Sequence, residues 1–282
     1  MQLAWSELAD GSRWRRTASS RRAPCAKSAG MSRCSAVLIA LDEEHRIGDA
    51  VRSVRPYVDE VLVLDGGSVD RTCERAQQAG ARVLEHPFDG FVSQKQRATL
   101  LARNDLVFAL DADERVDREL ARSLQEALDH AGSSGLAAWR VRRRNYLDGR
   151  PLRASGWYPD WRIRLFDRRR VSWSGEEPHD RLQTSGPVGV LAGHLIHDPS
   201  RTSAELRRST RLHAERRAHS LARSSRLIGP LSAPLRALGH LLRKLLLNAA
   251  LRDGRRGLTV ALVGAGGVYQ KYRRALQLRT GQ

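Results

Sequence analysis

The chain has 282 residues, 41% of them hydrophobic, and its 49 Lys and Arg residues exceed 31 Asp and Glu residues to give a net charge of +18. A chain of this length and apolar content can bury one sizeable core and a small appendage. The three cysteines (Cys25, Cys34 and Cys73) are odd in number and lack a C-x-x-C spacing, which excludes a disulfide framework and a zinc site and indicates a reducing compartment.

The excess positive charge lies at the two ends of the chain. Residues 1–30 carry 6 Lys and Arg against 2 Asp and Glu, residues 31–200 carry 25 against 26, and residues 201–282 carry 18 against 3. This distribution predicts a leader over 1–30, a folded domain over 31–200 and a basic extension over 201–282. The leader lacks the apolar core of a secretory signal, so we expect it to be disordered or to precede a true start at Met31.

Three apolar segments of the folded domain end in acidic or Gly-rich residues, and amphipathic stretches lie between them. Residues 35–41 lead into Asp42-Glu43-Glu44, residues 61–64 into Asp65-Gly66-Gly67, and residues 107–110 into Asp111-Ala112-Asp113-Glu114. This alternation predicts βαβ units and a mostly parallel sheet, and therefore an α/β fold.

Asp111 and Asp113 form an Asp-x-Asp pair directly after an apolar strand. On an extended backbone this spacing places both carboxylates on one face. At the carboxyl end of a buried strand, such a pair can hold a divalent cation against a nucleotide diphosphate. The alternative interpretation is a solvated acidic loop.

Further motifs follow in a fixed order, and together they are more specific than any one alone. They are His86-Pro87-Phe88-Asp89-Gly90-Phe91 with Gln94-Lys95, Arg143-Arg144-Asn145-Tyr146, Gly156-Trp157-Tyr158-Pro159-Asp160, Arg164-Leu165-Phe166 and Trp173-Ser174-Gly175. With the three strand ends, these motifs resemble family 2 glycosyltransferases, in particular the branch that decorates the lipopolysaccharide inner core. The resemblance covers about residues 32–198 and implies a GT-A-type, Rossmann-like domain.

The resemblance implies a site for a nucleotide-sugar donor. Asp113 is the expected ligand of Mg²⁺ or Mn²⁺, because these ions prefer hard carboxylate oxygens. Asp111 is expected to face the ribose or to act through water, and Asp65 to accept a hydrogen bond from the nucleobase imide. Ala40 and Glu43 should line the same nucleoside slot. The branch usually has Asn where this chain has Asp42, which puts the details of base recognition in doubt.

Lys95 can reach the leaving diphosphate by a charge-assisted hydrogen bond. A solvated helix residue is the alternative for this lysine.

Inverting transfer needs a general base for the acceptor hydroxyl. The block at residues 173–180 resembles the branch's Trp-Ser-Gly-x-x-Val-His-Glu, which makes Asp180 the first candidate. An Asp is shorter than the usual Glu, so Glu177 and Asp160 stay open as alternatives. His179 is expected to orient the carboxylate, or else to be structural.

Aromatic and basic residues in the same region suit a charged sugar acceptor. Trp157 and Tyr158 can pack against the apolar faces of sugar rings, although a hydrophobic core corner would have the same composition. Arg164, with neighbouring arginines, suits phosphate or carboxylate groups. These residues predict an anionic glycolipid acceptor such as the lipopolysaccharide core.

The basic extension has two candidate partners, nucleic acid and an anionic membrane surface. Leucines 238, 241, 242, 245 and 246 recur at helical spacing among basic residues, which favours a helix lying at a membrane surface. A helix packed on the main domain is the alternative. The run 257–268 is too short to span a bilayer and rich in Gly, so it is either an interfacial segment or a packing helix.

The sequence thus predicts a metal-dependent inverting hexosyltransferase, with glucose as the leading sugar, on the cytoplasmic face of a bacterial inner membrane. No specific nucleic-acid partner is expected, because no nucleic-acid module is recognised. A basic nucleic-acid-binding protein and a non-catalytic scaffold are the rival interpretations.

Overall fold

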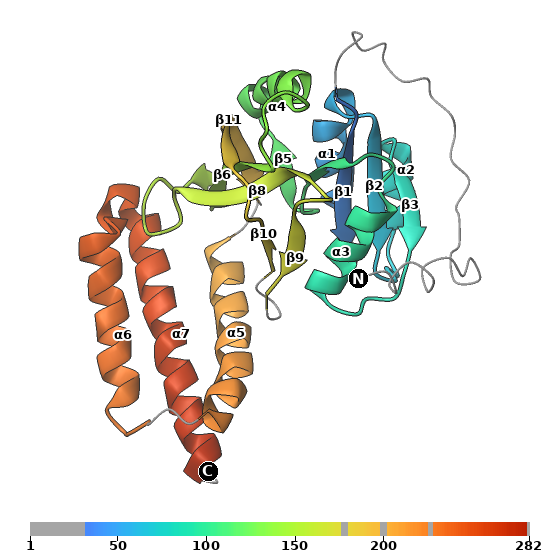
Figure 1. The fold of residues 1–282 in the computed structure, drawn as a ribbon. Coiled ribbons are helices and arrows are strands. Elements are labelled where there is room, and N and C mark those ends of the chain that lie inside the picture. Colours follow the sequence, from blue (N-terminus) through green and yellow to red (C-terminus); the bar gives the residue numbers. More distant parts are fainter. Residues whose placement is uncertain (1–31, 176–179, 198–201, 225–227, 281–282) are drawn as a thin grey trace. The chain divides into compact units, whose positions relative to one another are not determined.

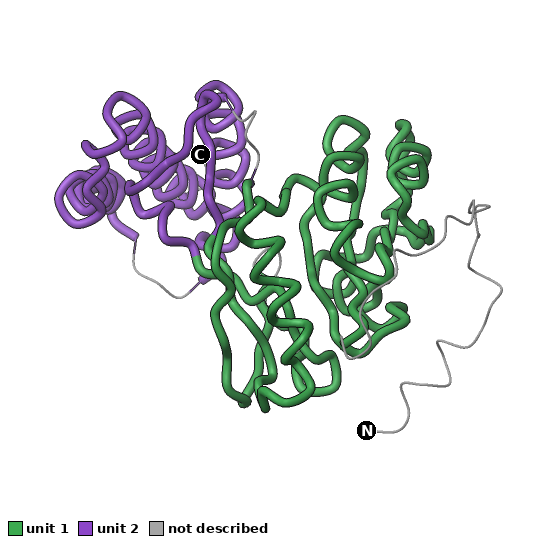
Figure 2. The backbone as a smooth tube through the Cα atoms, turned by 90° about the horizontal axis from the view of Figure 1, so that it is seen from above, with its two compact units in different colours: residues 1–142, 161–196 green, residues 143–160, 197–282 purple. Residues whose placement is uncertain are grey.

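The computed structural model describes residues 32–175, 180–197, 202–224 and 228–280. The chain forms two compact units, shown in different colours in Figure 2. The first comprises residues up to Arg142 together with Trp161–Ile196, and the second comprises Arg143–Asp160 together with the residues from His197 onward. The predicted division near residue 200 stays a prediction; contacts in the structure group residues 143–160 with the C-terminal helices.

A parallel sheet forms the centre of the first unit. Its strands β1 (Cys34–Ala40), β2 (Glu60–Asp65), β3 (Arg82–Glu85) and β4 (Leu106–Ala109) lie in the order β3-β2-β1-β4. The pairs β1–β2, β2–β3 and β1–β4 are all parallel. Residues of β1 and β2 are almost all buried, as expected for parallel strands covered on both faces.

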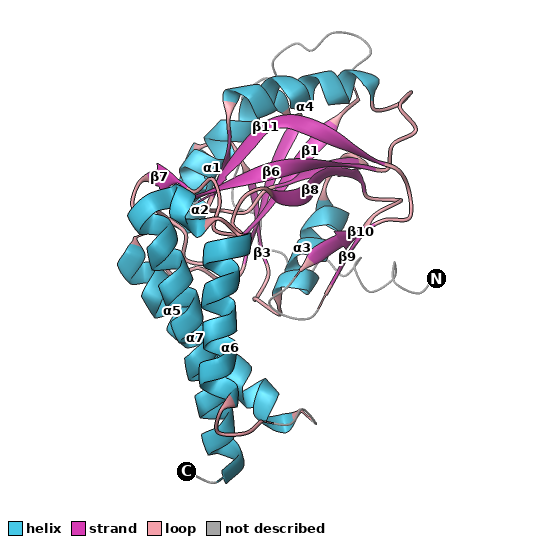
Figure 3. Cartoon of the chain, turned by 90° about the vertical axis from the view of Figure 1, so that its left-hand side faces the viewer, coloured by secondary structure: helices cyan, strands magenta, loops and turns pink. Residues whose placement is uncertain are grey.

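The sheet continues beyond β4 with antiparallel pairing. Strand β8 (Asp160–Asp167) runs antiparallel to β4 and sets Leu165 opposite Phe108. The order then continues through β6 (Ala138–Leu147), β11 (Val188–His197) and β5 (Glu114–Val116), and β7 (Arg150–Pro151) pairs with β6. Strands β9 (Ser172–Ser174) and β10 (Arg181–Gln183) form a separate antiparallel pair, visible in Figure 3.

Helices cover both faces of the parallel strands (Figure 1). Helices α1 (Ile47–Val54), which continues into a short 3₁₀ turn (Arg55–Tyr57), α2 (Thr72–Gln78) and α4 (Arg118–His130) contribute to one core cluster, together with one alternate set of strand residues. Helix α3 (Phe91–Leu101) contributes to the other cluster with the remaining set. Successive side chains of a strand point to opposite faces of the sheet, which explains why the strand residues divide between two clusters. The predicted Rossmann-like α/β class is confirmed.

The order in which strands are added to the sheet changes direction at β1. From β1 it moves outward through β2 and β3, and then returns to place β4 on the other side of β1. In open α/β sheets a ligand crevice forms at such a switch point, outside the carboxyl ends of the strands. Because β1, β2 and β4 are parallel, Ala40, Asp65 and the residues after Ala109 lie at the same edge of the sheet.

The second unit is mainly helical. It contains α5 (Ser203–Arg223), α6 (Ser232–Leu242), a π-helical turn (Arg243–Leu247), a 3₁₀ turn (Ala250–Asp253) and α7 (Gly254–Thr280), and α7 packs against both α5 and α6. The Gly-rich run at 257–268 therefore belongs to one continuous helix. Within the described ranges, none of the helices has an apolar stretch long enough to cross a bilayer.

Candidate active site

Hydrogen bonds tie the loop after β1 to the loop after β2. The Gly66 N–H donates to the Ala40 carbonyl at 2.7 Å. The N–H groups of Asp42 and Glu43 donate to the hydroxyls of Ser68 (2.9 Å) and Thr72 (2.8 Å). The predicted nucleoside-binding residues Ala40 and Glu43 therefore lie where these hydrogen bonds join the two loops at the switch point.

Asp65 organises the loop that follows its own strand. Its side chain is buried, and Oδ2 accepts hydrogen bonds from the N–H groups of Gly67 (2.9 Å) and Ser68 (2.8 Å), while Oδ1 accepts one from the Ser68 hydroxyl. Burial raises the pKa of the nearby Cys73 thiol to about 12, with further increases from Asp65 and Glu85. The predicted contact between Asp65 and a nucleobase stays a prediction.

Lys95 links two carboxylates of the predicted site. Its Nζ lies 2.7 Å from Asp111 Oδ1 and 2.8 Å from Asp180 Oδ2. The lysine comes from α3, Asp111 follows β4, and Asp180 precedes β10. Lys95 is only 8% exposed, so the alternative of a solvated helix residue is wrong.

Arg164 joins Asp111 to a third carboxylate. Its Nη2 lies 2.7 Å from Asp111 Oδ2 and 2.6 Å from Glu114 Oε1, and Glu114 is fully buried. The other Glu114 oxygen accepts the Asp111 N–H at 3.2 Å. Arg164 therefore stabilises the turn after β4, and its predicted acceptor contact stays a prediction.

The pKa values of this cluster follow from its burial and its ion pairs. Burial lowers the pKa of Lys95, but Asp111 and Asp180 raise it more, so the net shift is upward. Burial alone would raise the pKa of Asp111, yet Arg164 and Lys95 hold it well below the usual range. Burial also opposes the charge of Arg164, while Asp111 and Glu114 raise its pKa overall. These three groups are therefore charged at neutral pH.

The ammonium group of Lys95 lies over the indole ring of Trp173. The Lys95 Nζ lies 5.0 Å from the centroid of the Trp173 ring, a cation–π distance. The indole N–H donates to the Thr99 hydroxyl at 3.0 Å, and the ring packs edge-on against Phe166 at 6.4 Å between centroids. This tryptophan is 8% exposed and positions the lysine.

Asp113 lies in the turn between β4 and β5 and is partly exposed. Asp111 of the same Asp-x-Asp pair is held by Lys95 and Arg164. The role of Asp113 as a metal ligand stays a prediction. The donor chemistry of this residue fits Mg²⁺ or Mn²⁺.

Asp117, Glu119 and His194 form a separate group in which one potential ligand atom of each lies within 4.8 Å of the others. Asp117 caps α4 by accepting the Leu120 N–H at 2.8 Å. Asp117 also lies 3.4 Å from His194 Nδ1, so its carboxylate both caps the helix and pairs with this histidine.

The remaining predicted residues divide between the second unit and undescribed positions. Trp157, Tyr158 and Asp160 belong to the second unit, where Arg143 holds Asp160 at 2.7 Å. Glu177 and His179 lie outside the described residues. The roles of all five stay predictions.

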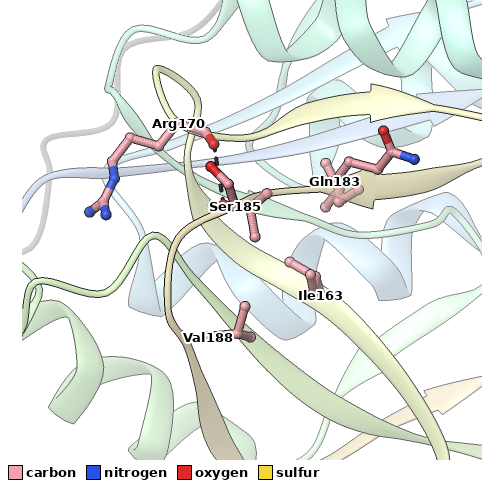
Figure 4. Close-up of a pocket in the computed structure, with 7 residues that line it drawn as sticks. Ile163, Arg170, Gln183, Ser185 and Val188 are labelled. Carbon is pink, nitrogen blue, oxygen red and sulfur yellow. Dashed lines mark hydrogen bonds between the residues drawn. The ribbon is translucent and has the colours of Figure 1, made fainter.

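A cavity of about 650 Å³ lies elsewhere in the first unit and takes none of the predicted site residues. Its lining comprises Ile163, Arg170, Leu182, Gln183, Thr184, Ser185 and Val188. In Figure 4 the guanidinium of Arg170 extends away from Ile163 and Val188, and it donates to the carbonyls of Gly135 and Leu136. Arg170 is the one titratable residue among the described residues that line this cavity.

Two contributors to the site, Glu114 and Trp173, are not evident from the sequence motifs. Glu114 stands in the motif after β4 but received no role, although its i+3 spacing from Asp111 is the signal that would have included it. The support that Trp173 gives Lys95 depends on the packing of β9 against α3, which no local pattern encodes.

Comparisons with known proteins identify the family of the chain. A family model described as "Glycosyl transferase family 2" matches residues 35–185, more than half of the chain. A lipopolysaccharide core biosynthesis glycosyltransferase, LpsC, of Rhizobium meliloti (strain 1021) is 32% identical over 170 residues, which cover 58% of this chain and 62% of that protein. An uncharacterized glycosyltransferase of Rickettsia felis is 40% identical over 104 residues, covering 37% of this chain and 35% of that protein.

The match thus spans less than two thirds of the length of these curated relatives. A crystal structure of glucosyl-3-phosphoglycerate synthase from Mycobacterium tuberculosis, in complex with Mn²⁺, UDP-glucose and phosphoglyceric acid, aligns with 42% of this chain and 45% of that chain at 29% identity, with a TM-score of 0.34. That similarity is too low to place ligands in this chain. Because the family model matches more than half of the chain, the chain belongs to glycosyl transferase family 2.

Proposed function

We propose that this enzyme transfers a hexose, with glucose as the first choice, from a uridine or ADP-linked donor to an anionic glycolipid such as the lipopolysaccharide core. The observation that carries the proposal is the charge cluster at the switch point, where Lys95 joins Asp111 to Asp180. Support for the acceptor class comes from the similarity to the lipopolysaccharide core glycosyltransferase of Rhizobium meliloti.

In this proposal the donor binds across the carboxyl ends of β1, β2 and β4. Glu43 and Ala40 line the nucleoside, and Asp65 keeps the adjacent loop in shape for it. Asp113 would hold Mg²⁺ or Mn²⁺, which neutralises charge on the departing diphosphate when bound. Lys95 and Arg164 keep Asp111 ionised and fixed, so that its carboxylate faces the donor in one orientation.

Asp180 is proposed as the general base of a single displacement with inversion. As the acceptor oxygen attacks the anomeric carbon, its proton passes to the Asp180 carboxylate and the bond to the diphosphate breaks. Lys95 holds this carboxylate in place, with its Nζ 2.8 Å from Asp180 Oδ2.

The exchange Asp180→Asn tests this assignment, because it removes the proton acceptor at nearly constant volume. We expect kcat for sugar transfer to fall about 10²- to 10⁴-fold, while donor binding by calorimetry stays within about twofold. Asp105→Asn, at an exposed carboxylate paired with Arg168 and Arg169, is the matched control and should retain activity. An unchanged kcat in Asp180→Asn would reject this base and leave Glu177 and Asp160 as candidates.

We also propose that the C-terminal helices attach the enzyme to an anionic membrane surface. Leucines along α6 and the π-helical turn are exposed: Leu231, Leu235, Leu238, Leu242 and Leu246. Basic residues lie among them, and each one near an anionic leaflet contributes about 1 kcal/mol. The combination of an exposed apolar stripe and flanking cations suits a helix lying in the headgroup region.

Flotation with lipid vesicles tests this attachment. We expect the protein to float with vesicles that contain phosphatidylglycerol but not with pure phosphatidylcholine vesicles, and binding should weaken as salt increases. The double variant Leu235→Ser with Leu242→Ser should bind at least tenfold more weakly. Leu100→Ser, at an exposed leucine of α3 in the first unit, is the matched control. Equal binding of all three proteins would contradict the attachment through α6.

A further inference from the structure

Residues 152–159 form the loop between β7 and β8, and this loop carries Trp157 and Tyr158. Asn145 of β6 holds the loop at two points. Its carbonyl accepts the Leu152 N–H at 2.8 Å, and its side-chain amide donates to the Trp157 carbonyl at 2.9 Å. The carbonyl of the same side chain contacts His197 Nδ1 at 2.8 Å. The beginning and the aromatic part of the loop are therefore fixed to β6, the strand that pairs with β7.

The middle of the loop is held by a single carboxylate from the C-terminal region. Asp253 Oδ1 accepts the Arg153 N–H at 2.8 Å, and Oδ2 accepts the Ala154 N–H at 3.0 Å and the Ser155 hydroxyl at 2.7 Å. Asp253 is the last residue of the 3₁₀ turn before α7. Three donors from consecutive loop residues thus bind one side chain that lies about 100 residues further along the sequence.

The π-helical turn and the residue after it complete this arrangement. The Ser155 N–H donates to the Asn248 carbonyl at 2.8 Å, and the Ser155 carbonyl accepts Lys244 Nζ at 2.7 Å. Ser155 is fully buried and has a φ of 61°, a conformation that residues other than Gly rarely adopt. A Cβ atom at Gly156 would lie 2.5 Å from Asn248 Nδ2. The loop therefore adopts a conformation that its own sequence does not favour, and the C-terminal contacts maintain it.

We propose that Asp253 is a positioning residue for acceptor recognition: by fixing residues 153–155, it sets the conformation in which Trp157 and Tyr158 meet the acceptor. This inference rests on the proposed function, because it assigns the acceptor to that loop. The helical extension then contributes to specificity through a defined contact, in addition to any attachment to a membrane. A Trp157 N–H donating to the Ala154 carbonyl at 3.0 Å connects the clamped residues directly to the aromatic ones.

The test combines loop mobility with the kinetics of the full-length enzyme. Hydrogen exchange reports on the amides of Arg153, Ala154 and Ser155, and transfer is measured with lipopolysaccharide core oligosaccharide freed of lipid A. In Asp253→Ala we expect at least tenfold faster exchange at Arg153 and Ala154. The acceptor KM should rise at least tenfold, while kcat and donor affinity change less than twofold. Asp253→Asn keeps one acceptor oxygen and should restore part of the acceptor affinity.

Asp148→Ala is the matched control, because Asp148 also accepts two hydrogen bonds within the second unit but from Ser203 at the start of α5. It should leave the exchange of residues 153–155 and the acceptor KM unchanged. Faster loop exchange with an unchanged acceptor KM in Asp253→Ala would overturn the inference and leave the proposed function standing. Unchanged exchange would show that the clamp does not hold the loop, and absence of transfer by the wild type would contradict both proposals.

Discussion

Arg164 shows how one side chain can hold the carboxylates of the proposed donor site in place. Its guanidinium is 4% exposed and lies between the carboxylates of Asp111 and Glu114, of which Glu114 is fully buried. Removal of the guanidinium would take away the cation that pairs with the buried Glu114 carboxylate, and breaking a buried ion pair typically costs about 3–5 kcal/mol. The arginine is therefore essential to the turn that carries the Asp-x-Asp pair.

We expect Arg164→Gln to lower the free energy of unfolding at pH 7 by about 3 kcal/mol and to raise the pKa of Asp111. The folded-state pKa of Asp111 lies below its unfolded value, so its stabilising contribution is complete above the usual Asp pKa of about 4 and is lost as pH falls through the lowered value. The stability difference between wild type and variant should therefore shrink below about pH 4. Urea unfolding at a series of pH values measures both effects.

Arg169→Gln is the control for this comparison, because Arg169 pairs with Asp167 and Asp105 at the surface. Its removal should change the unfolding free energy much less than the loss of Arg164. A stability difference between wild type and Arg164→Gln that is constant from pH 7 to pH 3 would contradict the role given to Asp111.

The sequence pointed to Asp111 and Asp113 but not to the ion pairs that hold Asp111. Asp111 and Asp113 could be found because they follow an apolar strand, a local signal. The ion pair between Asp111 and Arg164 joins residues 53 positions apart, and it depends on the antiparallel pairing of β8 with β4. Local periodicity contains no information about that pairing.

At the scale of single elements, α7 shows how packing overrides composition. Its Gly-rich segment has poor helix propensity, yet α7 is continuous over Gly254–Thr280. Gly257 is buried against the preceding 3₁₀ turn, where a Cβ atom would lie 1.7 Å from the Ala250 carbonyl oxygen. Glycine is required at this position because the two backbones meet there.

Two glycine substitutions in α7 should therefore have opposite effects. Gly257→Ala should lower the melting temperature, because overpacking at a backbone contact costs about 1–3 kcal/mol. Gly266→Ala should raise the melting temperature, because no atom lies within 4 Å of the added Cβ. Ala is more favourable than Gly inside a helix by about 0.5–1 kcal/mol. Calorimetry measures the melting temperature of both variants. A decrease of similar size in both melting temperatures would contradict the close contact at Gly257.

The elements that the sequence predicted well are those with continuous apolar runs. Strands β1, β2 and β4 lie within one residue or two of the segments 35–41, 61–64 and 107–110. Strands β6, β8 and β11 were not predicted as strands. Arginines interrupt β6 and β8, and their partly exposed faces give no continuous signal. The C-terminal helices could be anticipated from leucine spacing, but the π-helical turn could not.

At the scale of the whole molecule, charge and chemistry are divided between two units. The first unit contains the acidic strand ends together with Lys95 and Arg164, and the second contains the basic helices and the loop with Trp157 and Tyr158. The charge distribution along the sequence predicted the basic helical region. It could not predict that residues 143–160 group with that region, because this depends on contacts such as those of Asp253.

The most direct test of the account is calorimetric titration of UDP and ADP into the wild type and Asp113→Asn, with Mn²⁺ and after its removal by a chelator. The account predicts that the wild type binds at least one nucleotide more than tenfold more tightly with Mn²⁺, and that Asp113→Asn loses this enhancement while keeping its melting temperature. Asp129→Asn, on the exposed side of α4, should behave as the wild type. Metal-enhanced binding that survives in Asp113→Asn, or no nucleotide binding by the wild type, would contradict the central claim that the strand-end carboxylates build a nucleotide-sugar site.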